Sequence, residues 1–230
     1  MDERLERGLA DLLAGGVAGG VFPGAAAALA LPDGAVAAAV AGDVAASGAA
    51  VSHRTRFDLA SLTKLFTALA IARLVDRGAL GLDDPCRRFF PALAGAPLGA
   101  VSVELLLAHE SGLPAWRPLY EAMPAGVRGA PAGAGRLVEL AAGTPLEAAP
   151  KERAVYSDLG FILLGAIAAR AGECSLAELL EREVTGPLGL DGVAPRPAGP
   201  PGPKTAADAF AHTERCPWRG RVLVDRKSVV

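Results

Sequence analysis

The sequence is short of cysteine and of aromatic residues. Aromatic side chains make up 5% of its 230 residues, and its three cysteines are Cys86, Cys174 and Cys216. The cysteines lie far apart and form no C-x-x-C pair, which argues against a disulfide framework and against a structural zinc site. We therefore expect three small thiols in the core or at the surface.

An excess of basic residues and a long apolar run are also missing. Lys and Arg total 23 against 25 Asp and Glu, a formal net charge of −2, so a nucleic-acid surface is not expected. No stretch approaches the ~18–20 apolar residues of a membrane span, and the charged residues 1–7 lack the apolar segment of a signal peptide. We expect a soluble, cytoplasmic protein.

Small apolar residues are abundant. Hydrophobic residues make up 51% of the chain, and much of this fraction is alanine, as in residues 25–28. The chain is long enough for one globular domain with a substantial core. We expect that core to be rich in small side chains.

Apolar spacing, turn residues and cap residues predict more helix than strand. Two apolar runs around Pro32-Asp33-Gly34 predict a β-hairpin, and residues 55–57 are a further candidate strand. Helices are predicted at residues 3–13, 62–77, 103–109 (capped by Ser102), 136–142, 159–171 (buried) and 175–183 (a surface helix capped by Ser175). An antiparallel sheet needs about three strands for independent stability. The hairpin and residues 55–57 are the only strands that the sequence pattern predicts.

Ser61 and Lys64 form the clearest candidate for chemistry. They lie three residues apart where a helix begins, so both side chains share one helix face. A serine hydroxyl becomes a useful nucleophile when a neighbouring base takes its proton, and a desolvated lysine can be that base. The alternative is that Ser61 caps the helix and Lys64 is solvated.

Tyr156 and Asp158 form a second candidate, at the start of the predicted buried helix. A phenol near a lysine ammonium loses its proton more easily and can act as a general base. Asp158 could hold a lysine in place. The alternative is that Ser157 or Asp158 caps the helix while Tyr156 packs.

Four motifs together resemble the serine β-lactamase and penicillin-binding protein superfamily, especially the class C β-lactamase-like esterases and carboxypeptidases. They are FDLASLTK (57–64), LLLAHESGLP (105–114), YSDLGFILLG (156–165) and PLGL (187–190), in the family's order and approximate spacing. The resemblance implies an acylated nucleophile at Ser61, an activating base at Lys64 and assistance to proton transfer by Tyr156. It also implies that the backbone N–H of Ser61 supplies half of an oxyanion hole. It implies no cofactor and no metal.

Asp158 stands where the family more often has an asparagine that orients the lysine and the substrate amide, so we expect it to bind substrate. A carboxylate in place of a carboxamide removes two N–H donors and adds negative charge beside Lys64. This change favours a protonated lysine and favours simple esters over lactam amides. His109 and Glu110 resemble a metal or catalytic pair, but the resemblance makes them a structural helix end followed by a bend at Gly112.

The third active-site motif of the family, K-T-G or H-x-G on a late strand, has no match. Lys204-Thr205-Ala206 lacks the glycine, His212-Thr213-Glu214 fails likewise, and residues 199–205 are not a phosphate loop because proline replaces a glycine. We therefore expect a chain that is truncated at its C-terminus, with residues 225–230 foreign to the family. Loss of one oxyanion donor typically costs about 10²–10³ in rate.

The combined interpretation is an α/β (α+β) protein of the β-lactamase type. We expect an antiparallel sheet packed with helices over residues 1–194, a mostly helical region at about 84–188, and an irregular connector and tail at 195–230, with the C-terminal strands of the sheet missing. The expected function is hydrolysis of a small-molecule ester or amide through an acyl-serine. The alternative is a degenerate member that binds cell-wall peptide or a partner protein without turnover. The sequence leaves the oligomeric state open.

Overall fold

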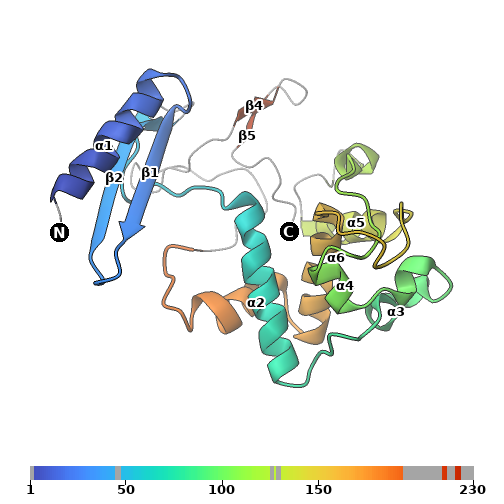
Figure 1. Ribbon diagram of the computed structural model, residues 1–230. Coiled ribbons are helices and arrows are strands. Elements are labelled where there is room, and N and C mark those ends of the chain that lie inside the picture. Colours follow the sequence, from blue (N-terminus) through green and yellow to red (C-terminus); the bar gives the residue numbers. More distant parts are fainter. Residues whose placement is uncertain are drawn as a thin grey trace. The chain divides into compact units, whose positions relative to one another are not determined.

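The computed structural model describes residues 3–44, 48–124, 127, 131–193, 214–216 and 221–223 (Figure 1). The chain divides into two compact units, one of residues 1–60 and 201–228 and the other of residues 61–200 and 229–230. Residues 204–206, 212–213 and 225–230, on which the expectations about the third motif and the C-terminus depend, lie outside the described residues.

The first unit is built from a helix and a small sheet. Helix α1 (Glu3–Ala18) packs on strands β1 (Gly24–Ala30) and β2 (Val36–Val44), which pair antiparallel from Gly24 opposite Gly42 to Ala30 opposite Val36. The predicted hairpin is confirmed, and its turn is closed by a hydrogen bond from the backbone N–H of Ala35 to the carboxylate of Asp33. Ala37 and Ala39 on β2 are buried, but most of the buried apolar side chains of the described residues are leucine, valine or isoleucine, so the expectation of a core rich in small side chains is wrong.

Two predictions about strands are wrong. Residues 55–57 contribute a single bridge residue, Arg56, and no strand, and the third strand of the sheet is β3 (Ala49–Ala50), which pairs with Asp43 and Val44 of β2. The tail predicted to be irregular contains a two-stranded antiparallel hairpin, β4 (Glu214–Cys216) with β5 (Arg221–Leu223). These strands are only two or three residues long, too short for a period-2 apolar pattern to be recognised.

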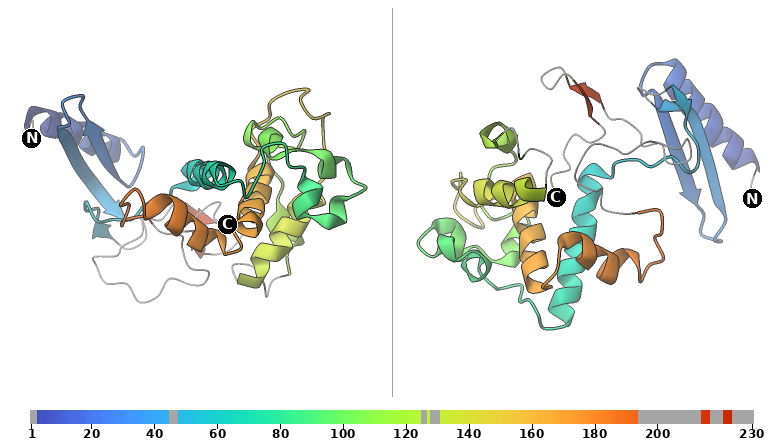
Figure 2. Two further views of the ribbon diagram at one scale, coloured as in Figure 1. Left: turned by 90° about the horizontal axis from the view of Figure 1, so that it is seen from below. Right: turned by 180° about the vertical axis from the view of Figure 1, so that it is seen from behind.

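The second unit is mostly helical. Its longer helices are α2 (Thr63–Asp76), α5 (Pro131–Ala142) and α6 (Asp158–Ala171), and its shorter ones are α3 (Cys86–Phe89), α4 (Val103–Leu107) and α7 (Leu176–Leu180). Single 3₁₀ turns lie at η1 (Ala60–Leu62), η2 (Pro91–Leu93), η3 (Pro97–Ala100) and η4 (Leu119–Ala122). Helix α6 packs against α2, α4, α5 and α7 (Figure 2).

Helix α6 is buried because it is apolar almost all round, as predicted. Leu159, Leu163, Leu164 and Ile167 are each at most 1% exposed. Its first turn is capped by Ser157, whose side chain accepts a hydrogen bond from the N–H of Gly160. The predicted cap of α4 is also confirmed, since Ser102 accepts from the N–H of Leu105.

The last predicted helix differs from the structure. Ser175 forms a capping box with Glu178, as its cap role predicts, but the α-helix ends at Leu180 and continues as a π-helix, η6 (Glu181–Thr185). The segment lies at the surface as predicted, because Ala177, Glu178, Glu181 and Arg182 are exposed. Its inner face buries Leu179, Val184 and Glu183. The Glu183 carboxylate lies 2.6 Å from Arg77, the residue that follows α2.

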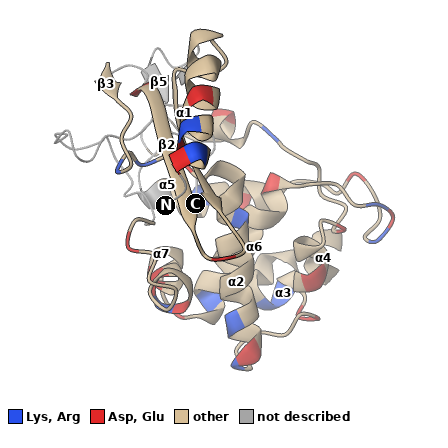
Figure 3. Cartoon of the chain, turned by 60° about the vertical axis from the view of Figure 1, so that its left-hand side comes forward, with Lys and Arg blue, Asp and Glu red and all other residues tan. Residues whose placement is uncertain are grey.

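Charged side chains of both signs are scattered along the helices, while β1 and β2 carry a single charged residue, Asp43 (Figure 3). Among the described residues, no single helix has the length and apolar character to cross a membrane, although α6 and the segment 176–185 pass such a test as a pair bent by 80°.

Candidate active site

Ser61 lies on the 3₁₀ turn that leads into α2. The backbone N–H of Ala60 donates to the side chain of Asp58, and Ala60 has a positive φ of 44°. The N-cap position of α2 is occupied by Leu62, so Ser61 does not cap the helix. The interpretation of Ser61 as a capping residue is therefore wrong.

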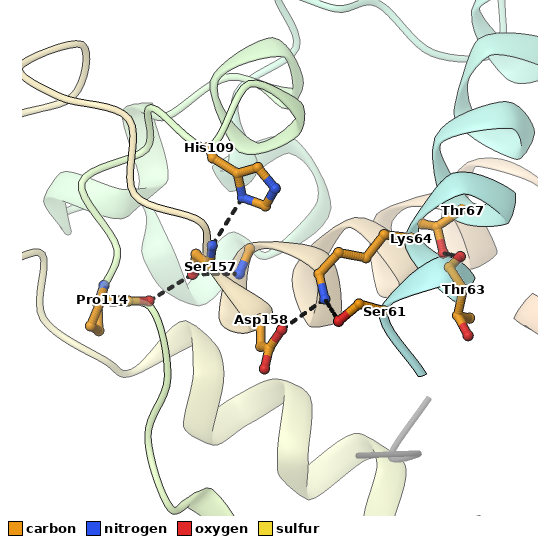
Figure 4. Close-up of polar contacts among 9 residues, drawn as sticks. Ser61, Thr63, Lys64, Thr67, His109, Pro114, Ser157 and Asp158 are labelled. Carbon is orange, nitrogen blue, oxygen red and sulfur yellow. Dashed lines mark hydrogen bonds and ion pairs between the residues drawn. The ribbon is translucent and has the colours of Figure 1, made fainter. Parts of the chain in front are cut away.

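Lys64 lies one helical turn after Ser61, and its Nζ donates to Ser61 Oγ at 3.4 Å (Figure 4). The spacing argument for a shared helix face is confirmed. The Lys64 side chain is 15% exposed, so it is not the solvated surface lysine of the alternative interpretation. A hydroxyl and an amine thus meet in a largely desolvated position.

Asp158, the first residue of α6, holds the other side of the Lys64 ammonium. Its Oδ1 lies 2.7 Å from Lys64 Nζ, and its side chain is 18% exposed. Figure 4 shows the Lys64 ammonium between Ser61 and Asp158. The two motifs are 94 residues apart in the sequence and meet here through one ion pair.

Tyr156 faces the same ammonium but remains accessible. Lys64 Nζ lies 4.8 Å from the centre of the Tyr156 ring, and Tyr156 is 53% exposed. Hydrogen bonding with Ser61, and then hydrogen bonding with Lys64 and its positive charge, lower the pKa of the Tyr156 phenol below its ordinary value of 10.0, against the opposing effects of burial and of the Asp158 carboxylate. Tyr156 therefore does not simply pack in the core.

The short segment before α6 is held by the segment that follows α4. The N–H of Val155 donates to the carbonyl of His109 at 2.8 Å, and the N–H of Asp158 donates to the carbonyl of Ala115 at 2.9 Å. Between them, the Ser157 hydroxyl donates to the carbonyl of Pro114 at 2.7 Å while it caps α6 (Figure 4). The residue that caps the helix therefore also ties the Tyr156 segment to its neighbour.

His109 is part of this support. Its Nδ1 accepts a hydrogen bond from the N–H of Ser157 at 3.0 Å, and its ring lies against Tyr156 at 4.7 Å and Phe161 at 5.2 Å between ring centres. Burial and the charge of Lys64 lower the pKa of the His109 imidazole, and the Asp158 carboxylate opposes them. The sequence predicts a structural helix end here, and Gly112 does make the expected bend with a φ of +81°.

No group of three or more His, Cys, Asp or Glu side chains within the described residues is arranged to hold a metal ion. Cys86 is a free, buried thiol, and burial raises its pKa to about 11, so it is a poor nucleophile. Within the helical unit, Ser61 and Lys64 on one side and Tyr156 and Asp158 on the other are brought together.

Comparison with known proteins identifies the family of the chain. The family model described as Beta-lactamase matches residues 9–225. The chain belongs to the beta-lactamase family. The resemblance predicted from the four motifs is thereby confirmed, and so is the mixed α/β fold class, because solved relatives share it.

The relatives of this beta-lactamase family member differ in the reactions that their names state. The chain is 35% identical over 136 residues to the D-alanyl-D-alanine-carboxypeptidase/endopeptidase AmpH of Escherichia coli K12, covering 57% of this chain and 34% of that protein. It is 35% identical over 155 residues to the esterase EstB of Burkholderia gladioli, covering 63% and 39%. A solved class C beta-lactamase superposes with a TM-score of 0.68 at 25% identity, covering 84% of this chain and 51% of that one.

The chain thus spans between a third and about half of the length of these relatives.

The sequence did not predict the contact of the His109 ring with the N–H of Ser157. The position of His109 three residues before the bend at Gly112 is the available local signal. No local pattern predicts which distant N–H donates a hydrogen bond to its ring.

Proposed function

We propose that this protein hydrolyses an ester or an amide through a covalent acyl-serine at Ser61. The observation that carries the proposal is the contact of Lys64 Nζ with both Ser61 Oγ, at 3.4 Å, and Asp158 Oδ1, at 2.7 Å. A serine beside a partly buried lysine and a phenol of lowered pKa has the parts that nucleophilic catalysis needs. Membership of the beta-lactamase family supports the same chemistry.

Two groups could take the proton of Ser61, and the ion pair favours Tyr156. A lysine that is paired with a carboxylate is an ammonium, which has three N–H donors and no lone pair to accept a proton. The sequence-based prediction made Lys64 the activating base. We assign that role to the Tyr156 phenolate, and to Lys64 the orientation of Ser61 and the stabilisation of the phenolate.

In acylation, Ser61 Oγ attacks the substrate carbonyl carbon while its proton moves to the Tyr156 phenolate. The tetrahedral intermediate then collapses, the bond to the leaving group breaks, and the Tyr156 phenol returns the proton to the leaving alcohol or amine. The backbone N–H of Ser61 is one donor available to the oxyanion. In deacylation, water replaces the leaving group, the acid is released and the Ser61 hydroxyl is restored.

Asp158 bears on the choice of substrate. Its carboxylate offers acceptors only, so it cannot hold a substrate carbonyl oxygen as an amide side chain would. This chemistry favours substrates that do not need such a donor, and simple esters are the first class to try. Peptides ending in D-alanine and lactams are the amide classes to compare with them.

A fluorophosphonate probe tests the proposal. It should label wild-type protein at Ser61, as located by mass spectrometry of the labelled peptide, and labelling should vanish in Ser61→Ala. The matched control is Ser175→Ala, which removes an exposed hydroxyl at the cap of α7 and should leave labelling unchanged. Persistent label in Ser61→Ala would show that the nucleophile is wrongly assigned.

Turnover is a separate question from labelling. With p-nitrophenyl acyl esters, a burst followed by steady release in the presence of a metal chelator supports a hydrolase that needs no metal. A burst of one equivalent with no further release would refute hydrolysis and favour a protein that binds without turnover.

A further inference from the structure

We propose that His109 is a positioning residue for Tyr156, acting through the hydrogen bond from the Ser157 N–H to its Nδ1. The inference rests on the proposed function, because it concerns the group to which that function assigns the proton transfer. His109 belongs to the segment after α4, and it is neither the nucleophile nor the base. Its contacts are with Tyr156 and the neighbouring backbone rather than with Ser61.

His109 binds the chain on both sides of Tyr156. The N–H of Val155, the residue before, donates to the His109 carbonyl at 2.8 Å, and the N–H of Ser157, the residue after, donates to the His109 imidazole at 3.0 Å. One residue therefore fixes the two peptide groups that flank the phenol. Because backbone N–H bonds have narrow geometry, they limit how far the Tyr156 backbone can rotate.

The imidazole also packs on the Tyr156 ring itself. The two ring centres lie 4.7 Å apart at an interplanar angle of 37°, and the Phe161 ring lies 5.2 Å from His109. Tyr156 is 53% exposed, so the core does not hold it in place. The His109 ring and the two flanking hydrogen bonds therefore help to keep the phenol beside Lys64 and Ser61, together with the hydrogen bond from Ser157 to Pro114.

The hydrogen bond from Ser157 also requires one protonation state of the His109 imidazole. Nδ1 accepts a hydrogen bond from the backbone N–H of Ser157, so in the neutral ring the proton is on Nε2. A protonated imidazole has donors at both nitrogens and cannot accept from Ser157. Three charged or titratable groups surround the His109 ring and affect its protonation. They are Lys64 from α2, Asp158 from α6 and Tyr156 from the segment before α6.

The backbone conformation of His109 is unusual for a residue other than glycine. Its φ is +61°, in the left-handed region, where asparagine is tolerated better than most residues. Asparagine also carries its Oδ1 at the same bond distance from the backbone as Nδ1 of histidine. His109→Asn should therefore keep the acceptor for Ser157 and lose the ring, whereas His109→Phe keeps a ring and loses the acceptor.

Tyr156 can be observed directly in this protein. The chain has two tyrosines, Tyr120 and Tyr156, so in a Tyr120→Phe background the phenolate absorbance at 295 nm reports Tyr156 alone. A role in overall stability would not move this titration in folded protein. The second readout is the second-order rate of fluorophosphonate labelling at Ser61, and His53→Ala, at an exposed histidine of the first unit, is the matched control.

We expect His109→Ala to raise the pKa of Tyr156 toward its ordinary value and to slow labelling about 10- to 100-fold, the scale on which small misplacements act. His109→Asn should recover at least half of both effects and His109→Phe should recover neither. The proposal is overturned if His109→Ala leaves the pKa of Tyr156 unchanged and its labelling rate lies within twofold of wild type. It is also overturned if His109→Phe restores the two readouts and His109→Asn does not. The Asn and Phe variants allow the comparison even if the Ala variant does not fold.

The two proposals can fail separately. If wild-type protein is not labelled but the Tyr156 titration still depends on His109 and recovers with Asn, the hydrolase proposal fails and the positioning role stands. If wild-type protein is labelled and the titration ignores His109, the positioning role is refuted and the hydrolase proposal stands.

Discussion

Lys64 Nζ on α2 lies 2.7 Å from Oδ1 of Asp158, the first residue of α6, although the two residues are 94 positions apart. Both side chains are less than one-fifth exposed, so the pair is poorly screened by solvent. The same ammonium reaches Ser61 at 3.4 Å. One cation therefore links the nucleophile's helix to the helix that follows Tyr156.

Removal of the Lys64 charge should affect stability and labelling in separable ways. Lys64→Met keeps the length of the side chain but leaves Asp158 with one partner fewer, and we expect a loss of about 2 kcal/mol in unfolding free energy. Labelling of Ser61 should fall by about 100-fold or more, because the phenolate of Tyr156 loses its nearby cation. Urea unfolding and probe labelling measure the two effects.

The double variant Lys64→Met with Asp158→Asn separates them. Without the carboxylate, no charge is left that has lost its Lys64 partner, so most of the lost stability should return while labelling stays low. If labelling returns together with stability, then Lys64 has only a structural role.

Local spacing was enough to predict half of the site. The interval of three residues between Ser61 and Lys64 predicts a shared helix face, and the cap sequence at Ser157 predicts where α6 begins, because both depend on backbone geometry within one or two turns. The buried character of α6 is equally local, since the segment is apolar almost all round.

The other half depends on which helix ends meet, and periodicity does not contain that information. The ion pair of Lys64 with Asp158 and the acceptance of the Ser157 N–H by His109 join segments that are 94 and 48 residues apart. The π-helical end of the 176–185 segment also has a tertiary context, because Glu183 is paired with arginines that include Arg77 at the end of α2. The motif resemblance predicted the first of these meetings but not the other two.

Tyr156→Phe should slow labelling of Ser61 by about 10²–10⁴-fold and abolish its rise with pH. The phenolate is the reactive form, so the wild-type rate increases as pH rises through the pKa of Tyr156, which lies below 10.0. Because the Asp158 carboxylate opposes the lowering, Asp158→Asn should move this rise to lower pH. A pH profile of the labelling rate measures both. A rise that survives in Tyr156→Phe would assign the base to another group.

Gly112→Ala should be costly for two reasons. The residue has a φ of +81°, and a Cβ there would collide with the carbonyl oxygen of Ala148, so we expect a loss of at least about 3 kcal/mol in unfolding free energy. Gly189→Ala is the matched control, with a φ of +63° and no atom within 4 Å of the new Cβ. It should lose only about 1–2 kcal/mol, the strain of the left-handed conformation. Equal losses in urea unfolding would refute the steric argument.

Arg77→Ala tests the buried carboxylate of Glu183. That side chain is 1% exposed and lies 2.6 Å from Arg77 and 2.8 Å from Arg182, so the loss of one donor should cost about 1.5–3 kcal/mol. Arg136→Ala is the matched control, because its pair with Glu139 is half-exposed on both sides and should cost less than about 1 kcal/mol. Neither variant should change labelling of Ser61. Similar costs for the two variants would argue that Glu183 does not need Arg77.

Acid should weaken the folded state in part through His109. Burial and the charge of Lys64 hold the folded pKa of His109 below the ordinary value of 6.5. Between these two pKa values the unfolded chain binds more protons at this residue than the folded chain, so stability falls as pH falls through that window and is unaffected above it. Lowered carboxyl pKa values, such as that of Asp84, add a loss of the same sign, but only as pH falls through the ordinary carboxyl value of 3.8.

His109→Asn separates the histidine from those carboxyl groups. Asparagine does not titrate, so between pH 7.5 and 5 the variant should lose less unfolding free energy than wild type, while the carboxyl groups add little in either protein because they titrate at lower pH. Urea unfolding at the two pH values gives the difference. An equal loss in both proteins would mean that His109 titrates alike in the folded and unfolded states, and its ring would then not be confined between Tyr156, Phe161 and the Lys64 charge.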